Sequence, residues 1–456
     1  MPFLKHDRIP PAQVVILGFL FQILIGACLL SLPVATQSGE RVPFLDALFT
    51  ATSATCVTGL VIHDTALFWS PFGQGVILLL IQVGGMGVVT MAVAIFMFSG
   101  RKIGLKQRWV MQESISAPQV GGIVRMTGFI LKTAFLIEAI GALLLALRFC
   151  PQFGLGKGIW YGIFHAVSAF CNAGFDLMGE TGAFSSLTGY VGDPLVNLVI
   201  CLLIVVGGLG FLTWHDVAAH GRHVSQYRLQ SKLILLTTLA LLVGGFLFFR
   251  FYEFSRPQWA ALTGGERGLA ALFQSVSPRT AGFNTVDLTQ LSACSQLMTI
   301  LLMLAGGSPG STAGGFKTTT LAVLLLSVGA VIRRQEYLAA PEAQSLSGGG
   351  LRLPDQVLRN ACAIFLLYLL LFLAGGMLIC CMDEIPLMQA LFEAASAIGT
   401  VGLSLGATAE ASEASRLILI FLMYFGRVGG LTMIYAMAAG SNGASSQYPQ
   451  EQVTVG

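Results

Sequence analysis

The chain has 456 residues, of which 55% are hydrophobic and only 10% are charged. A soluble protein of this length needs far more charge to cover its surface, so the composition excludes one. The net charge of +3 is too small to indicate a nucleic-acid partner, and no basic run interleaved with aromatic residues supports one.

Eight apolar blocks are long enough to cross a bilayer, which takes about 20 residues as a helix. They occupy residues 13–33, 72–98, 126–147, 195–211, 233–249, 297–332, 361–382 and 417–439. The first is longer than the apolar core of a signal peptide, so we interpret it as a retained spanning helix. The sequence therefore predicts an all-α polytopic membrane protein with eight spanning helices.

A shorter, semi-apolar segment lies between the two spans of each successive pair. These segments begin near Phe44, Trp160, Leu269 and Leu387. They are too short to cross, and each ends in a polar stretch with glycine, so we predict four re-entrant half-helices. Basic residues gather in the loops between pairs and acidic residues in the loops within pairs, which predicts cytoplasmic termini and re-entrant segments that enter from outside.

The re-entrant segments repeat one another. Their sequences are LFTATSATCVTGL (48–60), IFHAVSAFCNAGF (163–175), LFQSVSPRTAGF (272–283) and LFEAASAIGTVGL (391–403). Each has Phe second, Ser sixth, and a closing glycine followed by Leu or Phe. The closing glycines are Gly59, Gly174, Gly282 and Gly402, and they recur at intervals of nearly a quarter of the chain.

This recurrence predicts four tandem units, each a span, a re-entrant loop and a span, around one central pore. We place them at residues 1–100, 101–220, 221–335 and 336–440, followed by a cytoplasmic tail at 441–456. An ion that leaves water loses solvation worth tens of kcal/mol unless other oxygens replace it. Backbone carbonyls supply such oxygens, and glycine permits the unusual φ and ψ angles that point them at one axis. Four such loops predict a cation filter within one subunit.

Three acids follow the loops and would concentrate cations at an outer mouth: Asp64, Asp176 and Asp287. After the fourth loop there is no acid before Glu410. The alternative is that these are ordinary solvated loop residues.

The sixth block is interrupted at residues 305–315 by five glycines, a proline and three hydroxyl residues. Such a stretch cannot form a continuous helix, and it is tolerated at membrane depth only where it lines a cavity or is buried in protein. Lys317 follows it, and Arg427 interrupts the last block; a charge at this depth costs at least about 2.5 kcal/mol and usually faces a cavity or a partner.

Three further features have less specific explanations. We expect Arg279, inside the third loop, to point behind the loop and bond carbonyls or an acid of a neighbouring unit. His215, Asp216, His220 and His223 resemble metal ligands, but no second cluster completes a site, so a solvated face is the favoured interpretation. Glu138, midway along the third span, has no explanation beyond a buried hydrogen bond.

The stretches FLDALFTATSATCVTGL, QVGGMG, FCNAGFD, SPRTAGFNTVD, AGGSPGSTAGGFKTTT and GRVGGLT together resemble the Trk, Ktr and HKT superfamily of potassium transporters. The match covers nearly the whole chain. Eight spans and a short N-terminus make the Ktr-type membrane subunit more similar than the Trk type, which remains the alternative.

The resemblance implies potassium uptake through the four loops. The implied filter residues are Cys56, Val57, Thr58, Gly59, Cys171, Asn172, Ala173, Gly174, Arg279, Thr280, Ala281, Gly282, Gly399, Thr400, Val401 and Gly402. The implied gate below the filter comprises Ala305, Gly306, Gly307, Ser308, Pro309, Gly310, Ser311, Thr312, Ala313, Gly314, Gly315 and Lys317.

The resemblance further implies that Arg427 projects toward the pore as a barrier to cations, although a structural bond to carbonyls of the broken helix is the alternative. In relatives a serine at the Gly59 position accompanies sodium permeation, so Gly59 indicates potassium. It also implies a cell-membrane homodimer controlled by a cytosolic nucleotide-binding ring. No GxGxxG motif follows a strand here, so nucleotide control would come from a partner chain. Sodium coupling stays open, and no covalent cofactor is implied.

Two other classes of function are less consistent with the sequence. A secondary carrier of another solute would show inverted halves with paired broken spans rather than four parallel loops. An intramembrane protease would need a Ser–His or Asp pair within the spans, and we see no catalytic constellation, so we expect no enzyme.

Overall fold

The computed structural model describes residues 10–87, 90, 112, 123–333, 354–430 and 432–433. The predicted tail and most of two predicted cytoplasmic loops lie outside these residues. Within them the regular structure is helical, apart from one isolated β-bridge between Thr36 and Trp69. The α-helices are α1 (Pro11–Leu30), α2 (Phe44–Thr55), α3 (Thr65–Phe68), α4 (Pro71–Met86), α7 (Ile123–Phe153), α8 (Leu155–Phe170), α9 (Pro194–Gly208), α10 (Phe211–His220), α11 (Leu229–Phe248), α12 (Gly264–Val276), α13 (Ala293–Leu304), α14 (Thr318–Ile332), α15 (Asp355–Asp383), α16 (Leu387–Gly399), α17 (Ala407–Glu410) and α18 (Glu413–Val428). A π-helical turn, Phe249–Glu253, extends α11, and short 3-10 turns lie at Pro33–Ala35, Met178–Glu180, Thr188–Tyr190, Val224–Gln226, Pro257–Trp259 and Leu288–Gln290.

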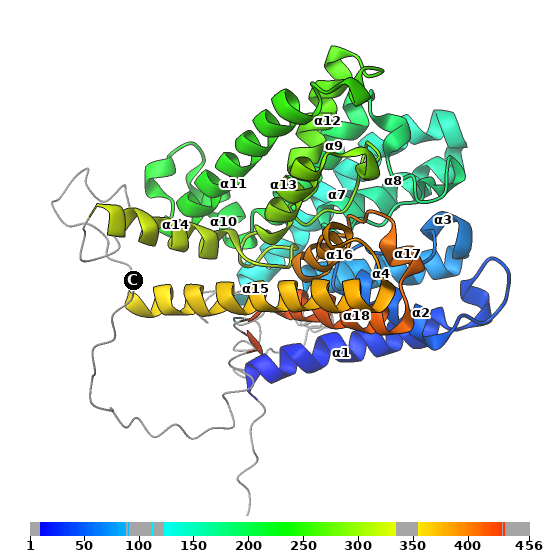
Figure 1. Ribbon diagram of the computed structural model, residues 1–456, viewed down its shortest axis with the longest axis horizontal. Helices are drawn as coiled ribbons and strands as arrows, with labels where there is room; N and C mark the ends of the chain where they lie inside the picture. The colour runs from blue at the N-terminus through cyan, green and yellow to red at the C-terminus, as the bar shows by residue number, and fades with distance from the viewer. Residues whose placement is uncertain are drawn as a thin grey trace, which may run out of the picture.

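Four of the described helices are long and apolar enough to cross a membrane: α1, α7, α11 with its π-helical turn, and α15. In their most apolar stretches 33% of the residues or fewer are buried. Leu136 and Leu236, for example, expose 61% and 62% of their surface. Apolar surface on this scale is stable against lipid chains and not against water. Figure 1 shows α1, α15 and α18 side by side along the long axis of the molecule.

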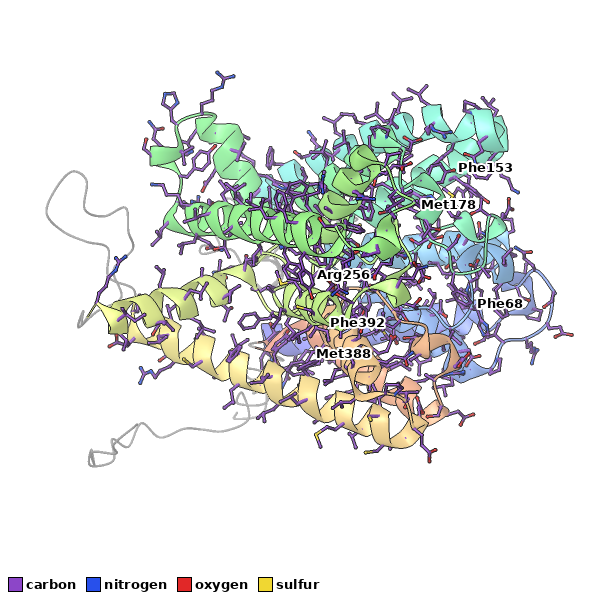
Figure 2. All side chains as sticks on the ribbon, turned by 45° about the horizontal axis from the view of Figure 1, so that its top comes forward. Phe68, Phe153, Met178, Arg256, Met388 and Phe392 are labelled. Atoms are coloured by element: carbon purple, nitrogen blue, oxygen red, sulfur yellow. The ribbon has the colours of Figure 1, made fainter. Side chains whose placement is uncertain are left out.

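The short helices α2, α8, α12 and α16 pack against the long helices, each against the one that precedes it in the chain. The Phe at the second position of each repeated segment is the anchor. These residues are Phe49, Phe164, Phe273 and Phe392, and each is at most 1% exposed. Figure 2 shows Phe392 near the middle of the molecule and Phe153, at the end of α7, near its edge. The repeated Phe therefore fixes each short helix in the core.

The second helix of each group is shorter than the sequence predicts, because it breaks at glycine. The chain bends by 98° between α9 and α10. Gly87, Gly210 and Gly429 have φ angles of 87°, 89° and 89°, a region that side chains with a Cβ rarely adopt. We predicted an interruption only in the sixth block, at 305–315, where the structure has the break between α13 and α14. The blocks 195–211 and 417–439 were predicted as continuous, and this prediction is wrong: glycine ends each helix before the block does.

Candidate ion-conducting site

The four repeated segments adopt one backbone conformation after their helices end. Two residues in each have positive φ, the second being the closing glycine. The pairs are Val57 and Gly59, Asn172 and Gly174, Thr280 and Gly282, and Thr400 and Gly402. In an extended chain successive carbonyls point to opposite sides. Left-handed residues at alternate positions turn them toward one side, and glycine does so without steric cost.

The four loops meet in a closed ring. A Cβ built on Gly59 would lie less than 3 Å from the carbonyl oxygen of Ala173 in the second loop. The same relation joins Gly174 to the Ala281 oxygen, Gly282 to the Val401 oxygen and Gly402 to the Thr58 oxygen. The fourth loop therefore returns to the first, and no glycine of the ring has room for a side chain.

The serine of each repeated segment braces its loop. Ser53 Oγ and Ser396 Oγ accept hydrogen bonds from the N–H groups of Gly59 (3.1 Å) and Gly402 (3.0 Å). In the second loop Ser168 Oγ donates to the carbonyl of Phe175 at 2.7 Å. Ser277 donates likewise to the carbonyl of Phe283. A buried hydroxyl thus holds the backbone at the closing glycine in all four loops.

On one side of the ring lies a cavity of about 390 Å³. All four closing glycines line it, together with the predicted mouth residues Asp64, Asp176 and Asp287, and Glu410 of the fourth group. Burial is the largest influence on Asp176, and with the neighbouring charge of Asp64 it raises the pKa of this carboxyl to about 7. Asp64 also accepts a hydrogen bond from the Phe184 N–H at 2.8 Å, so it joins the first group to the second.

A smaller cavity, of about 100 Å³, is lined by residues of the interrupted segment and by both predicted membrane cations. Lys317 Nζ donates to the carbonyls of Ala313 (2.8 Å) and Gly314 (3.2 Å) within its own segment. Glycines of the segment pack directly under the ring, because a Cβ on Gly314 would meet Thr400 and one on Gly315 would meet the backbone of Gly399. The interrupted segment therefore lies between the ring and this cavity.

Three neighbouring elements hold the interrupted segment. Ser308 N–H donates to the Gly208 carbonyl at 3.0 Å, and Phe211 N–H donates to the Gly310 carbonyl at 2.7 Å, which attaches the segment to the bend between α9 and α10. Gly315 N–H donates to the Gly426 carbonyl of α18 at 3.0 Å. These hydrogen bonds hold the segment against α9, α10 and α18.

Arg427 lines the same cavity and bonds three carbonyls. Its guanidinium donates to Thr312 of the interrupted segment and to Gly84 and Gly85 at the end of α4, the last at 2.9 Å. Arg427 therefore makes the carbonyl hydrogen bonds that were the alternative expectation from the sequence. It also lines the cavity. A role as a barrier stays a prediction.

Comparison with known proteins places the chain in a family. The TrkH family, described as cation transport protein, matches residues 21–448. The chain belongs to the TrkH family. It is 38% identical to the potassium/sodium uptake protein NtpJ of Enterococcus hirae, over 99% of this chain and 98% of that protein. It is 39% identical to the Ktr system potassium uptake protein B of Bacillus subtilis, again over 99% and 98%.

The TrkH fold is also found in a solved structure. The crystal structure of the potassium transporter TrkH from Vibrio parahaemolyticus superimposes with a TM-score of 0.71, over 94% of this chain and 85% of that one, at 20% identity. Members of this family are transporters, so the chain is a multi-pass membrane transport protein and not an enzyme.

The sequence did not single out four further residues near the ring. The third residue of each repeated segment is polar and buried: Thr50, His165, Gln274 and Glu393. His165 Nε2 accepts the N–H of Leu177 at 3.3 Å, and Glu393 accepts that of Leu405 at 2.9 Å. Leu177 and Leu405 each stand three residues after a closing glycine. The signal was a polar residue among apolar ones at one fixed position of the repeat.

Glu138 also has a place in this site. Its carboxylate accepts hydrogen bonds from Gln82 Nε2 at 3.0 Å and from the thiol of Cys171 at 3.9 Å. Gln82 belongs to α4 and Cys171 to the second loop, so Glu138 ties a loop of the ring to the helix that Arg427 also contacts. No group of three or more potential metal ligands is present in the part of the chain that the structure describes; Asp216 instead accepts a hydrogen bond from Ser231 at 2.7 Å.

Proposed function

We propose that this chain is the ion-translocating subunit of a Ktr-type system and takes up potassium across the cell membrane. The observation that carries the proposal is the closed ring of four main-chain loops below an acid-lined cavity. Successive carbonyls facing one axis replace the water shell of a weakly hydrated monovalent cation, whereas a fixed carboxylate would bind it too tightly to release it. The relatives named above include a potassium uptake protein of a Ktr system, which supports the same ion.

The proposed path follows the order of the cavities. Cations gather in the outer cavity, where Asp64, Asp176 and Asp287 give it a negative potential. They shed water at the ring formed by residues 56–59, 171–174, 279–282 and 399–402. The segment 305–315 is the proposed gate, and Lys317 and Arg427 set a positive potential at the inner cavity that opposes passage.

Four tandem units around a pseudo-fourfold axis, at the boundaries given above, are part of the proposal. So are cytoplasmic termini, a homodimer and control by a cytosolic nucleotide-binding subunit. The similarity to Ktr system B proteins over the full chain supports a partner subunit, because a system by name has more than one component.

The direct test is growth of a bacterial strain that lacks its own potassium uptake, at low potassium, with this chain alone or with a Ktr-type regulatory subunit. We expect the chain to restore growth and rubidium uptake, and to do so more strongly with the regulatory subunit. The control is Gly282→Val, which fills the ring and should insert without conducting. Correctly inserted protein that fails to support growth in both settings would refute the uptake role.

A further inference from the structure

The ring of four loops has one junction that differs from the others. Three junctions join loops that follow one another in the sequence, whereas the fourth loop meets the first only because the chain folds back, with Gly402 packed on the Thr58 carbonyl. At this junction α18 packs against α2 and α1, and Figure 1 shows α18 beside α1. We call this contact of α18 with α1, α2 and the end of α4 the seam. Noncovalent contacts must hold it together.

Three polar side chains of α18 form hydrogen bonds across the seam. Near the start of α18, Arg416 Nη1 donates to Asp46 Oδ1 of α2 at 2.7 Å, although the two residues are 370 positions apart in the chain. Further along, the Tyr424 hydroxyl donates to the Ile16 carbonyl of α1 at 2.8 Å, and Arg427 donates to a carbonyl at the end of α4 at 2.9 Å. Between helices in lipid, where the hydrophobic effect gives no attraction, such bonds are an important part of what holds them together.

Asp46 connects the seam to the first loop. It is 7% exposed, and its Oδ2 accepts a hydrogen bond from His63 Nε2 at 3.1 Å. His63 stands four residues after Gly59 and directly before Asp64, which lines the outer cavity. The ring of His63 stacks on Phe68, with the ring centroids 4.0 Å apart. One buried carboxylate therefore joins α18 to the outer end of the first loop.

Arg279, behind the third loop, provides a contrast. It is 8% exposed and lines neither of the two cavities described above. We expected it to bond carbonyls or an acid, but its recorded hydrogen bond runs to the hydroxyl of Thr238 in α11, at 3.5 Å. That bond joins α11 to the loop after α12, which is the next helix in the chain. The ion pair of Arg416, by comparison, joins the two ends of the chain.

Loss of the Asp46 carboxylate would leave a cation unpaired at the seam. The side chain of Arg416 is 19% exposed, and among the described residues its Nε has no partner. Removing one member of a buried ion pair is more disruptive than removing both, because the remaining charge is left without a partner. Since α18 packs against α16, whose end begins the fourth loop, displacement of α18 would also displace that loop from the first.

We propose that Asp46 is a positioning residue for the ion filter. By holding Arg416 and His63 on the two sides of the seam, it fixes the spacing between the fourth loop and the first without touching the ion. The arrangement of the ring carbonyls decides which cation exchanges its water shell for them. A seam without this carboxylate therefore discriminates less against sodium. This inference rests on the proposed uptake function.

The test uses the purified full-length protein in lipid vesicles, with rubidium uptake measured in competition with sodium. We expect Asp46→Asn and Arg416→Gln each to lower the preference for rubidium over sodium by roughly fivefold. Arg148→Gln is the matched control, because it removes an ion pair of the same kind, with Asp193, away from the seam. This control should keep the natural preference whatever its effect on Tm, which separates filter spacing from general stability.

The double variant Asp46→Asn, Arg416→Gln completes a double-mutant cycle. Its loss of Tm should be smaller than the sum of the two single losses, because no charge is left unpaired, while its preference for rubidium stays lowered. If a single variant does not accumulate in the membrane, the preference of the double variant decides.

Two results would overturn the proposal alone: additive losses of Tm in the cycle, or a natural preference for rubidium in Asp46→Asn or in the double variant. Natural protein that takes up no rubidium would instead refute the potassium-uptake proposal, and the positioning role with it. The two failures are therefore distinguishable.

Discussion

Single residues set the chemistry at both ends of the ring. In the acid-lined cavity, Asp176 has a pKa raised to about 7, because burial and the charge of Asp64 both disfavour its ionised form. Asp287 lines the same cavity, yet its pKa is lowered: burial acts to raise it, but hydrogen bonds from Thr289 and Gln290 together outweigh that effect. Two acids of one cavity therefore respond differently to pH.

Apparent potassium affinity should weaken as the pH falls from about 8 to about 6, by roughly two- to fivefold, as Asp176 takes up its proton and the cavity loses a charge. Above a pH of about 7 Asp176 is ionised and attracts cations; below it the carboxyl is neutral. Uptake measured in vesicles over this range checks the effect. Asp176→Asn should abolish the pH dependence. Asp287→Asn should weaken potassium affinity at every pH but leave the pH midpoint of the change in affinity in place. Loss of that midpoint in Asp287→Asn would contradict its assignment to Asp176.

Gly59→Ser should lower the preference for potassium over sodium. The new Cβ would stand less than 3 Å from the Ala173 oxygen at a φ of 92°, so the neighbouring carbonyl must move and the ring loses its spacing. Relative permeability in vesicles is the measurement. Gly154→Ser is the matched control, because Gly154 also has positive φ, at 84°, with nothing near its Cβ position. Equal selectivity in Gly59→Ser and the natural protein would refute the filter assignment.

At the scale of helices, close crossings at glycine support the ends of the short helices. Gly84, Gly207 and Gly426 lie where α4, α9 and α18 cross the ends of the short helices, packed on the carbonyls of Thr55, Phe170 and Ile398. The motifs QVGGMG and GRVGGLT appeared in the sequence only as marks of resemblance. Their physical role, close helix approach followed by a break, depends on which elements cross, and local sequence does not encode that.

Gly207→Ala should destabilise the protein by about 1–3 kcal/mol, because its Cβ would overlap the Phe170 carbonyl, which a rigid helix end cannot move. Thermal unfolding of the purified protein measures the loss. Gly244→Ala in α11 provides the comparison, since nothing lies within 4 Å of its Cβ position. A Tm for Gly207→Ala as high as that of Gly244→Ala would show that the crossing tolerates a methyl group.

Arg427→Ala should raise potassium flux on the order of tenfold, corresponding to about 1.4 kcal/mol removed from the electrostatic barrier. Its carbonyl bonds offer a second explanation, release of the gate segment, and Arg427→Lys separates the two. Lysine keeps the charge but loses the fork that reaches both Thr312 and α4. Flux near the natural level in Arg427→Lys would support the electrostatic barrier. Flux as high as in Arg427→Ala would show that the hydrogen bonds of Arg427 to Thr312 and α4 restrain the gate segment. An unchanged rate in Arg427→Ala would contradict both.

Across the whole molecule, the sequence predicted the repeated segments but not the helix breaks or the contacts between distant parts of the chain. The helical membrane class, the four segments and the interruption at 305–315 follow from hydropathy and periodicity, which are local. The bend at Gly210 and the helix end at Gly429 were missed because an apolar run with few polar residues looks continuous until another element packs against it. Gln82, which bonds Glu138, and the carbonyls that bond Arg427 come from other quarters of the chain, so only the assembled structure supplies these contacts.

The ring closes within one chain, from Gly402 back to Thr58, so each subunit should conduct by itself even in a dimer. Vesicles that contain natural and Gly282→Val subunits, mixed before reconstitution, test this expectation. Flux should fall in direct proportion to the fraction of natural subunits, because an inactive neighbour leaves the four loops of its partner intact. A pore shared among four chains would instead lose flux as the fourth power of that fraction. A steeper than linear decline would therefore contradict the single-chain ring, and a control with subunits mixed after reconstitution fixes the linear reference.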